Sequence, residues 1–441
     1  MFSIDSPLVK DAALIAKMGP IYIPYVVTTN KEELLACRTT AWLGQTLNTS
    51  PIYDISGPDC VKLLNYTTVN RDYSTLKIGK SRHVIFCNEK GQMLADGVLF
   101  RISEDTYRSY WLAPVLSYYV ETLGFDVKGE WVRDEFFFQV DGPKSLEIME
   151  KASKTDLHDL KFAQNKEIEL LGVPCIIHRL GMSGTLAYEL HGPMKDAEKI
   201  YEYINNVGQE FGIKRLGQSS YPRNHTPGGY PNQFIHYWYP YLTSGEKMKE
   251  YFENQPYTKH LSGRYPFFGS ASFDKENAFL TPYDVDWGYL VNFDHDFVGK
   301  DALLKLSNDP PRKVVTLEWD ADDVGKVFAS QFKGKNVEPL DDIDRVGDGG
   351  EAKFIISNVV SDGKIIGMAS GRTKYYYENK MLSLAFIDKK YAVEGKELEV
   401  IWGTDPNNQM PIKVTVAKFP YYNEELRNET FDVEKIPHPV F

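Results

Sequence analysis

The chain has 441 residues, of which 42% are hydrophobic and 25% are charged, a balance typical of a globular protein rather than a disordered one. A single hydrophobic core stops growing below this length, so we expect two or three packed units. The formal net charge of -11 would repel a phosphate backbone, so we expect no nucleic-acid partner.

The start of the chain shows no targeting segment. Residues 1–6 lack the basic region and apolar core of a secretion signal, and no later stretch approaches the ~20 apolar residues of a membrane span. The four cysteines are widely spaced and form no C-x-x-C pair, so we expect buried thiols rather than a metal or redox site. We therefore predict a cytoplasmic protein with no membrane partner.

Helical and strand-like segments alternate in the first half of the chain. Residues 59–64 and 195–201 have the spacing of helices, and residues 84–86 have that of a strand. Residues 88–92 predict a tight hairpin turn, because Asn and Gly tolerate the positive φ that such a turn requires. Residues 93–101 are then the returning strand, and the alternation indicates an α+β fold.

The second half divides into an irregular segment and a β-rich segment. Periodicity is lost between residues 221 and 270, where Pro, Gly and aromatic residues dominate, and long ordered loops of this kind are usually functional. Tandem prolines at 310 and 311 predict a stiff linker. After the linker, short strands separated by Gly and Asp turns predict a separate β-domain; they are residues 313–319, 353–360, 381–387 and 412–418.

Four segments together resemble the glycine-cleavage T-protein, or aminomethyltransferase, superfamily. Residues 181–190 are similar to its G-x-x-G-x-x-x-x-E element, and residues 297–303 to its F-x-G-[KR]-x-A-L segment. Residues 56–64, at the start of the first helix, and the hairpin of residues 87–96 complete the set. The resemblance implies an α+β fold of three domains arranged as a cloverleaf around a channel that binds tetrahydrofolate.

The resemblance also implies a division of the chain. Residues 1–308 would form the folate-binding aminomethyltransferase-like region, with two α+β subdomains, and residues 312–425 a C-terminal β-barrel domain. Within the superfamily, residues 280–289 and 293–297 look like the L-T-P-W-D-x-x-Y-G and F-D-H-D-F segments of the tetrahydrofolate-dependent vanillate and syringate O-demethylases. This likeness implies an enzyme that moves a methyl group from a small methoxylated donor to tetrahydrofolate.

Tyr221 is the candidate acid for this chemistry, because it matches a tyrosine of the demethylase motif. Expulsion of a phenoxide requires a proton donor, and the ordinary tyrosine pKa of about 10 nearly matches that of a phenol. Without the motif, a tyrosine that fills an aromatic loop would be the default interpretation. Tyr230 in the same loop is expected to stack on the pterin or to wall the channel.

Two carboxylates are candidates for binding folate. Glu189 follows the G-x-x-G element, and an ionised carboxylate accepts the paired N–H donors of a pterin in a bidentate arrangement; the alternative is a surface glutamate in a salt bridge. Asp96 matches the second of the paired aspartates of the T-protein and would hold or polarise the folate amine. A strand-edge aspartate that binds a neighbouring N–H is an equally weighted alternative for Asp96.

The substrate side departs from the aryl-acid demethylases. Their histidine becomes Asn48 or Thr49 here, and their arginine becomes Leu112, so the cationic clamp for a substrate carboxylate is missing. We therefore predict a neutral, non-carboxylate, aromatic methoxylated donor, with Thr49 and Leu112 beside it. His83 is a further candidate for substrate contact, or alternatively a satisfied core histidine.

Other functions remain open from the sequence. Glycine-cleavage aminomethyl transfer would require groups that Ala95 and Ser219 replace, and a non-catalytic folate-binding factor is a third reading. We expect no metal, because the adjacent residues 294–296 (Asp-His-Asp) suit a turn better than a ligand set. The sequence does not distinguish O-, N- and S-methyl donors, nor does it determine the oligomeric state or the residues that hold the folate tail.

Overall fold

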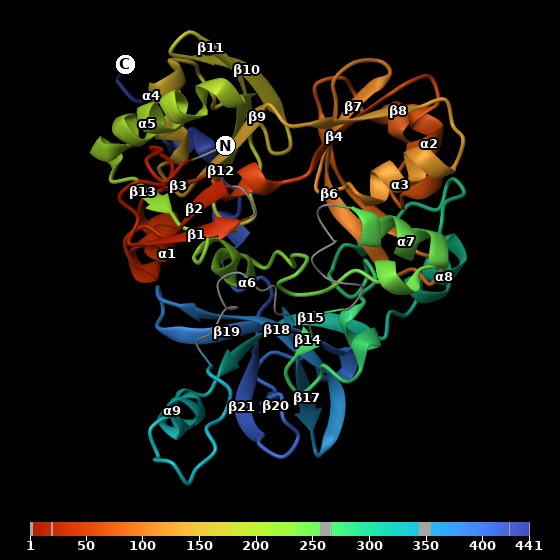
Figure 1. The fold of residues 1–441 in the computed structure, drawn as a ribbon, viewed down its shortest axis with the longest axis vertical. Coiled ribbons are helices and arrows are strands. Elements are labelled where there is room, and N and C mark those ends of the chain that lie inside the picture. The colour runs from red at the N-terminus through yellow and green to blue at the C-terminus, as the bar shows by residue number, and fades with distance from the viewer. Residues whose placement is uncertain are drawn as a thin grey trace.

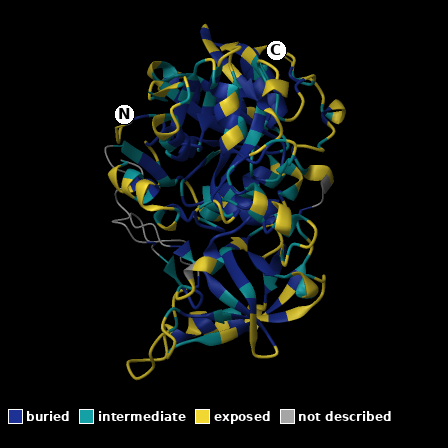
Figure 2. Ribbon diagram, turned by 90° about the vertical axis from the view of Figure 1, so that its right-hand side faces the viewer, coloured by how far each residue is buried: buried dark blue, intermediate teal, exposed yellow. Residues whose placement is uncertain are grey.

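The computed structural model describes residues 3–18, 21–255, 265, 267–343, 354–422 and 424–440. The chain forms three lobes, each built on its own sheet (Figure 1). Buried residues fill the inside of each lobe, and exposed residues lie mainly on the outer helices and loops (Figure 2). This arrangement is the α+β cloverleaf with a C-terminal β-barrel that the resemblance implied.

The first lobe contains a six-stranded sheet in the order β10-β11-β12-β9-β3-β13. All neighbouring strands are antiparallel except β3 and β13. Helices α4 and α5 pack together, with α4 also on β9, β10 and β12. The elements are α1 (Asn30–Thr39), β3 (Trp42–Gly44), β9 (Glu135–Asp141), α4 (Ser145–Ser153), β10 (Asn165–Leu170), β11 (Val173–His178), β12 (Ala187–Pro193), α5 (Ala197–Gly208) and β13 (Lys214–Leu216), beside the ribbon β1 (Leu14–Met18) and β2 (Ile21–Val26).

The second lobe contains a five-stranded antiparallel sheet in the order β5-β6-β7-β4-β8. Its hairpin confirms the predicted turn, and β6 spans Met93–Arg101 as predicted. The other elements are β4 (Ile52–Ser56), α2 (Cys60–Thr67), β5 (Ser81–Cys87), β7 (Thr106–Tyr110), α3 (Val115–Thr122), β8 (Lys128–Val132), α7 (Glu246–Asn254) and α8 (Lys300–Ser307).

Helix α7 lies inside the segment for which the sequence predicted irregular structure. Met248 and Phe252 are buried one turn apart on this helix, so it is held by an apolar stripe that the surrounding Pro, Gly and aromatic residues obscure. The rest of residues 221–255 forms short turns and loops, including η5 (Tyr221–Asn224), α6 (His225–Gly228) and η6 (Tyr241–Thr243). Residues 256–264 and 266 of the predicted loop lie outside the described residues.

The third lobe is a closed six-stranded barrel in the order β15-β19-β18-β17-β20-β21. Its strands are β15 (Arg312–Trp319), β17 (Ser357–Ser361), β18 (Lys364–Tyr375), β19 (Lys380–Asp388), β20 (Glu397–Trp402) and β21 (Met410–Ala417), with helix α9 (Ala321–Ser330) outside and the short β14 (Phe267–Phe268) paired to β16 (Phe354–Ile355). Four segments predicted as strands lie in this lobe, whereas β18 and β20 were not predicted; residue 353 lies outside the described residues.

The chain returns to the first lobe after the barrel. Arg179 on that lobe donates to the backbone carbonyl of Asn428 at 2.8 Å, and Val433 joins the apolar core under the six-stranded sheet. The C-terminus therefore ends beside α4 (Figure 1). All four cysteines are buried free thiols, as expected, and no helix among the described residues is long and apolar enough to cross a bilayer.

Candidate active site

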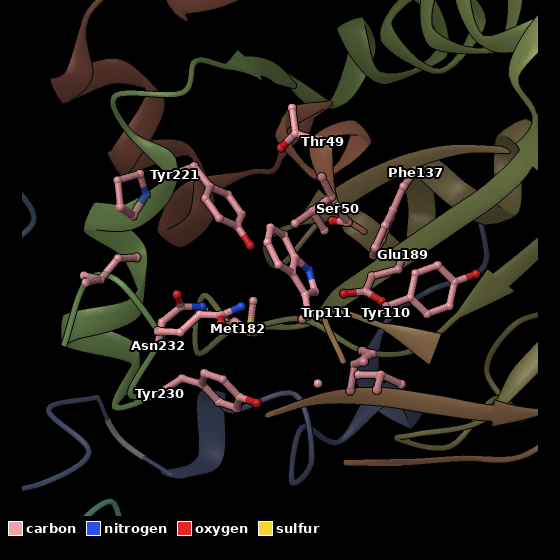
Figure 3. A pocket seen from close by; sticks show the side chains of 18 of the residues that line it. Thr49, Ser50, Tyr110, Trp111, Phe137, Met182, Glu189, Tyr221, Tyr230 and Asn232 are labelled. Carbon is pink, nitrogen blue, oxygen red and sulfur yellow. Dashed lines mark hydrogen bonds between the residues drawn. The ribbon is translucent and has the colours of Figure 1, made fainter. Parts of the chain in front are cut away.

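A cavity of about 2180 Å³ is lined by residues of the first two lobes and of the loop after η5. Figure 3 shows Tyr221, Tyr230, Trp111 and Glu189 around this space. Six of the residues predicted for the site line this one cavity, namely Thr49, His83, Asp96, Glu189, Tyr221 and Tyr230. Side chains that are far apart in the sequence therefore share one cavity.

Leu112 is the exception among the predicted site residues. Its side chain is fully buried in the core of the second lobe and does not line the cavity. The preceding residue, Trp111, has a positive φ of 69°, and its ring enters the cavity (Figure 3). The placement of Leu112 beside the substrate is therefore wrong, because the turn directs Trp111 inward and Leu112 into the core.

Asp96 on β6 is held by three side chains. His83 Nε2 lies 3.0 Å from Asp96 Oδ2, and the hydroxyl groups of Tyr237 and Tyr239 both donate to Oδ1, the latter at 2.6 Å. The Asp96 backbone N–H in turn donates to the Tyr239 hydroxyl at 2.8 Å. These side-chain partners fix the carboxylate. Asp96 is therefore not a strand-edge aspartate that binds only a neighbouring N–H.

The tyrosines around Asp96 keep their protons. Burial raises the pKa of Tyr237 and of Tyr239 well above the ordinary value, and the nearby charge of Asp96 adds to the effect. Both phenols therefore remain hydrogen-bond donors at neutral pH. His83, which lies on β5 and borders the cavity, also approaches the hydroxyl of Tyr230 at 3.4 Å, so it is both a cavity residue and a bonded partner of Asp96.

Glu189 lies on β12 directly opposite Gln139 of β9. Gln139 Nε2 donates to Glu189 Oε1 at 3.1 Å, while Oε2 lies 3.8 Å from His178 Nδ1. Burial lowers the pKa of His178, so this ring is neutral at pH 7 and does not neutralise the carboxylate. Glu189 is 5% exposed and is therefore not the surface glutamate of the alternative interpretation; Oε2 is available to a ligand donor.

Tyr221 begins η5, and its hydroxyl points into the cavity (Figure 3). The hydroxyl has no hydrogen-bond partner within the described ranges of the chain. Burial raises its pKa well above the ordinary value, and the charges of Glu189 and Asp141 raise it further. Tyr221 is thus a weaker acid than the unperturbed pKa suggested, and it suits donation of a hydrogen bond better than complete transfer of its proton.

Tyr230 walls the cavity together with two other rings. Its ring centroid lies 5.3 Å from that of Trp287 and 5.9 Å from that of His83. His225 packs edge-on against Tyr221 at 5.1 Å, and neither of its ring nitrogens has a partner in the part of the chain that the structure describes. Burial lowers the pKa of His225 to about 3, so a neutral ring supports Tyr221 from behind.

Two glycines of the G-x-x-G element allow close packing at the cavity wall. A Cβ on Gly181 would lie 2.2 Å from that of Ala187, and a Cβ on Gly184 would lie 2.6 Å from Cα of Gly228. Gly184 also has a φ of +72°, which favours glycine. The element thus brings residues 181–184 against the loop that carries Tyr221 and Tyr230.

The barrel supports the same loop from below. Ser370 Oγ on β18 donates to the backbone carbonyl of His236 at 2.6 Å, and the hydroxyl of Thr226 donates to the carbonyl of Gly371. A Cβ on Gly371 would lie 2.3 Å from the His236 ring, so only glycine permits this approach. The loop that carries the tyrosines therefore rests on the third lobe.

Three basic residues of the described chain line the cavity. Lys17 and Arg133 are exposed, and the half-buried Arg427 pairs with Glu429. Thr49 borders the cavity and donates back to the carbonyl of Thr46 at 3.0 Å. Asn48 accepts from the backbone N–H of Phe137 at 2.8 Å, so neither position offers a cation.

Several residues of the site were not identified from the sequence. Trp111, Gln139 and His225 carry no local motif. Tyr237 and Tyr239 belong to an aromatic run that is conspicuous in the sequence, and their one-residue spacing is consistent with two rings on the same side of an extended segment. That spacing is the signal that could have found them.

The chain is similar to proteins of known activity over most of its length. Residues 16–225 match the family model described as the GCVT N-terminal domain. The chain is 42% identical over 440 residues to sesamin methylene transferase of Sinomonas sp. (strain No.22), covering 97% of this chain and 96% of the relative. It is 30% identical over 403 residues to syringate O-demethylase of Sphingobium sp. (strain NBRC 103272 / SYK-6), covering 83% of each.

The fold gives an independent comparison. The crystal structure of glycine cleavage system aminomethyltransferase T from Bartonella henselae matches with a TM-score of 0.65 at 17% identity, over 95% of this chain and 96% of that chain. The three lobes and the shared cavity define a protein of the aminomethyltransferase fold. The chain belongs to the GCVT aminomethyltransferase superfamily, as its sequence motifs predicted.

Proposed function

We propose that the protein is an enzyme that transfers a one-carbon group from a neutral aryl ether to tetrahydrofolate. The observation that carries the proposal is the shared cavity, in which the unpartnered hydroxyl of Tyr221 and the carboxylate of Glu189 face the same buried space. Drug-sized ligands occupy pockets of roughly 300–1,000 Å³. The volume of about 2180 Å³ therefore suits a folate and an aromatic donor together.

The residues present fit a reduced folate. Glu189 suits the paired N–H donors of the pterin, because no described residue donates to Oε2 within hydrogen-bond distance and a carboxylate accepts two parallel hydrogen bonds. Asp96, fixed by His83 and two tyrosines, offers a second carboxylate for the folate amine. Tetrahydrofolate, when bound, supplies the amine nitrogen that accepts the carbon, and its N–H proton balances the proton that the released phenol gains.

Tyr221 is assigned to the departing oxygen of the donor. Its raised pKa keeps the hydroxyl protonated, and a buried donor aimed at an oxygen that gains negative charge stabilises the transition state more than the ground state. Trp111 and Tyr230 wall the space for the arene and exclude water. Among the described lining residues, each basic side chain is exposed or already paired with a carboxylate, which favours a donor without a carboxylate, such as guaiacol rather than vanillate.

The transferred carbon has two candidate forms. The sequence motifs favour a methyl group from a methoxyarene, whereas the 42% identity to sesamin methylene transferase favours a methylene group that bridges two aryl oxygens. The same residues serve both donors. Methyl transfer breaks one C–O bond and uses one folate N–H proton, whereas methylene transfer breaks two C–O bonds, forms two C–N bonds and moves two N–H protons to the two phenolic oxygens that are released. Ala95 and Ser219 replace groups expected for glycine-cleavage aminomethyl transfer, which is therefore the less favoured function.

Incubation with tetrahydrofolate and a panel of donors tests the proposal. Guaiacol and vanillate compare a neutral with a charged methyl donor, and 1,3-benzodioxole supplies a methylene donor. The folate product is identified by mass spectrometry. We expect turnover of a neutral member of the panel. Faster turnover of vanillate than of guaiacol would contradict the assignment of a neutral donor.

Two variants separate the roles of the cavity residues. Tyr221→Phe should lower kcat by about 10²–10³, the usual cost of removing one transition-state donor, with the Kd for tetrahydrofolate unchanged. Glu189→Gln should raise that Kd by about 10- to 100-fold, as expected when a charge-assisted bond is lost. Tyr188→Phe is the matched control, because that buried hydroxyl also lacks a partner among the described residues but lies outside the cavity. Normal turnover by Tyr221→Phe would remove Tyr221 from its role.

A further inference from the structure

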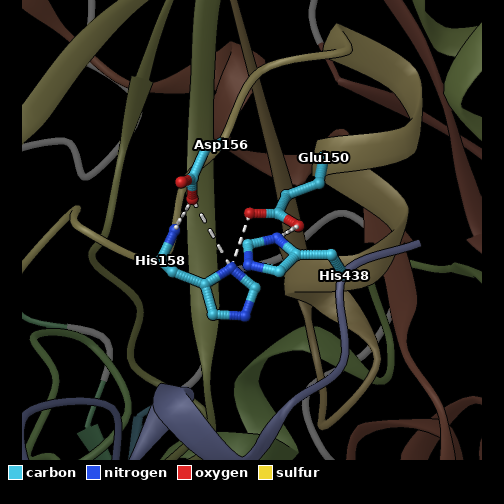
Figure 4. A group of neighbouring side chains, drawn as sticks. All are labelled: Glu150, Asp156, His158 and His438. Atoms are coloured by element: carbon cyan, nitrogen blue, oxygen red, sulfur yellow. Dashed lines mark hydrogen bonds and ion pairs between the residues drawn. The ribbon is translucent and has the colours of Figure 1, made fainter. Parts of the chain in front are cut away.

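A cluster of four titratable side chains lies away from the cavity, on the first lobe. Glu150 belongs to α4, Asp156 and His158 lie in the loop that follows, and His438 lies near the C-terminus. Figure 4 shows the four side chains converging. One ligand atom from each lies within 4.8 Å of the others, and none of the four residues lines the cavity.

The carboxylate of Glu150 is the centre of the cluster. Its side chain is fully buried, and His158 Nδ1 lies 2.7 Å from Oε1, while His438 Nδ1 lies 3.2 Å from Oε2. The backbone N–H of Leu157 also donates to Oε1 at 2.7 Å, which holds the carboxylate in place. Asp156 Oδ1 lies 3.6 Å from His158 Nδ1 at the exposed edge of the cluster.

The tautomer of His158 follows from its second contact. His158 Nε2 lies 2.8 Å from the backbone carbonyl of Ile436, which only accepts hydrogen bonds, so Nε2 carries a proton. In the neutral ring, Nδ1 then directs a lone pair at the Glu150 carboxylate. A lone pair and a carboxylate oxygen at this separation repel each other unless a positively charged group lies between them.

One imidazolium at His158, with a neutral His438 that donates from Nδ1, is the alternative without a metal, and the dependence of Tm on Zn²⁺ or on pH separates the two arrangements. Two protonated rings would supply the charge poorly. The imidazole centroids of His158 and His438 lie 3.9 Å apart, so two imidazolium charges would repel each other at close range. A single divalent cation shared by both Nδ1 atoms and the carboxylate satisfies all three groups at once. The N–H that His158 donates to a backbone carbonyl is the arrangement that usually orients a metal-binding histidine.

We propose that Glu150, Asp156, His158 and His438 bind one Zn²⁺ ion or a similar late first-row metal ion. With zinc–nitrogen bonds of about 2.05 Å, the ligand atoms of a tetrahedron lie about 3.3 Å apart. The two Nδ1 atoms lie 2.7 and 3.2 Å from different oxygens of Glu150, and Asp156 Oδ1 lies 3.6 Å from His158 Nδ1, so a small rotation of the carboxylate would complete the ligand set. Two nitrogen ligands favour zinc over magnesium or calcium, which take oxygen ligands. The site is structural, because all four positions are protein ligands.

The metal would connect two segments that are distant in the sequence. His158 and Ile436 are 278 positions apart, and residues 428–436 pack on the first lobe through Arg179 and Val433. A metal bound to both His158 and His438 therefore fastens the end of the chain to the lobe. We expect it to stabilise the fold without altering the cavity chemistry.

The test uses the full chain, first treated with a chelator and then titrated with Co²⁺ or Zn²⁺. We expect one Co²⁺ per chain with the intense visible absorption of a tetrahedral complex. Zn²⁺ at a hundredfold excess over its Kd stabilises the folded state by about 2.7 kcal/mol. In a chain of this length, that free energy should raise Tm by about 3 °C. His158→Ala and His438→Ala should each lower the affinity for Co²⁺ at least tenfold.

Two controls make the outcome decisive. His438 is largely exposed at the chain end, so His438→Ala is expected to fold normally, as circular dichroism will verify. His295→Ala removes a partly exposed histidine from outside the cluster and should leave metal binding unchanged. Absence of stoichiometric Co²⁺ binding, or equal binding by His438→Ala, would overturn the proposal, as would a Tm that varies with pH but not with Zn²⁺.

Discussion

Tyr239 contacts Asp96 twice, so Tyr239→Phe should destabilise the protein measurably. The substitution removes a hydrogen bond of 2.6 Å to the carboxylate and the acceptor of the Asp96 backbone N–H at 2.8 Å. A hydrogen bond to a charged group contributes about 1.5–3 kcal/mol, and an orphaned buried N–H costs about 1–3 kcal/mol. The two losses share one hydroxyl and are not fully additive, so we expect a loss of about 3 kcal/mol.

Urea denaturation followed by tryptophan fluorescence measures this loss, and Tyr188→Phe is the control. Tyr188 is equally buried, but its hydroxyl has no partner within the described ranges, so its removal should cost almost nothing. Hydrogen exchange gives a local readout, since the Asp96 amide should exchange faster in Tyr239→Phe. If both variants unfold at the same urea concentration and the Asp96 amide stays protected, the double contact does not stabilise the site.

Gly184→Ala should cost about 2–5 kcal/mol, because the methyl group would meet Cα of Gly228 at 2.6 Å with a φ of +72°. Gly172→Ala has a similar φ of +78° but open space, and should cost only about 1 kcal/mol in the same urea assay; equal losses would show that the contact is unimportant. Burial raises the pKa of Glu135, but His191 and Arg108 outweigh it and hold the pKa below the usual value. This stabilisation is present at neutral pH and is lost as pH falls through the lowered pKa, so Glu135→Gln should flatten the acid side of a plot of Tm against pH.

Local features of the fold could be predicted from the sequence. Gly91 in the hairpin turn has the positive φ that the sequence predicted, and the strand Met93–Arg101 follows from that turn. The G-x-x-G element before Glu189 and the motif around Tyr221 both led to residues that line one cavity. These predictions succeeded because periodicity and turn chemistry act over a few residues.

Contacts between distant segments could not be predicted. Tyr237 and Tyr239 reach Asp96 across 141 and 143 positions, and no local pattern specifies that pairing. Leu112 was misplaced because the positive φ of Trp111 exchanges the directions of two neighbouring side chains. The Glu150 cluster was missed for the same reason as the tyrosines, since His438 lies 288 positions from Glu150.

The support that β18 gives to the loop of Tyr221 and Tyr230 has a consequence for engineering this protein. Ser370 and Gly371 do not line the cavity that holds Tyr221 and Glu189, yet their hydrogen bonds position the backbone of the loop. A library that aims at new donors and varies only cavity residues would omit positions that shift both aromatic walls together. Replacement of strand β18 by that of a homologue would therefore change donor preference while every cavity side chain stayed the same.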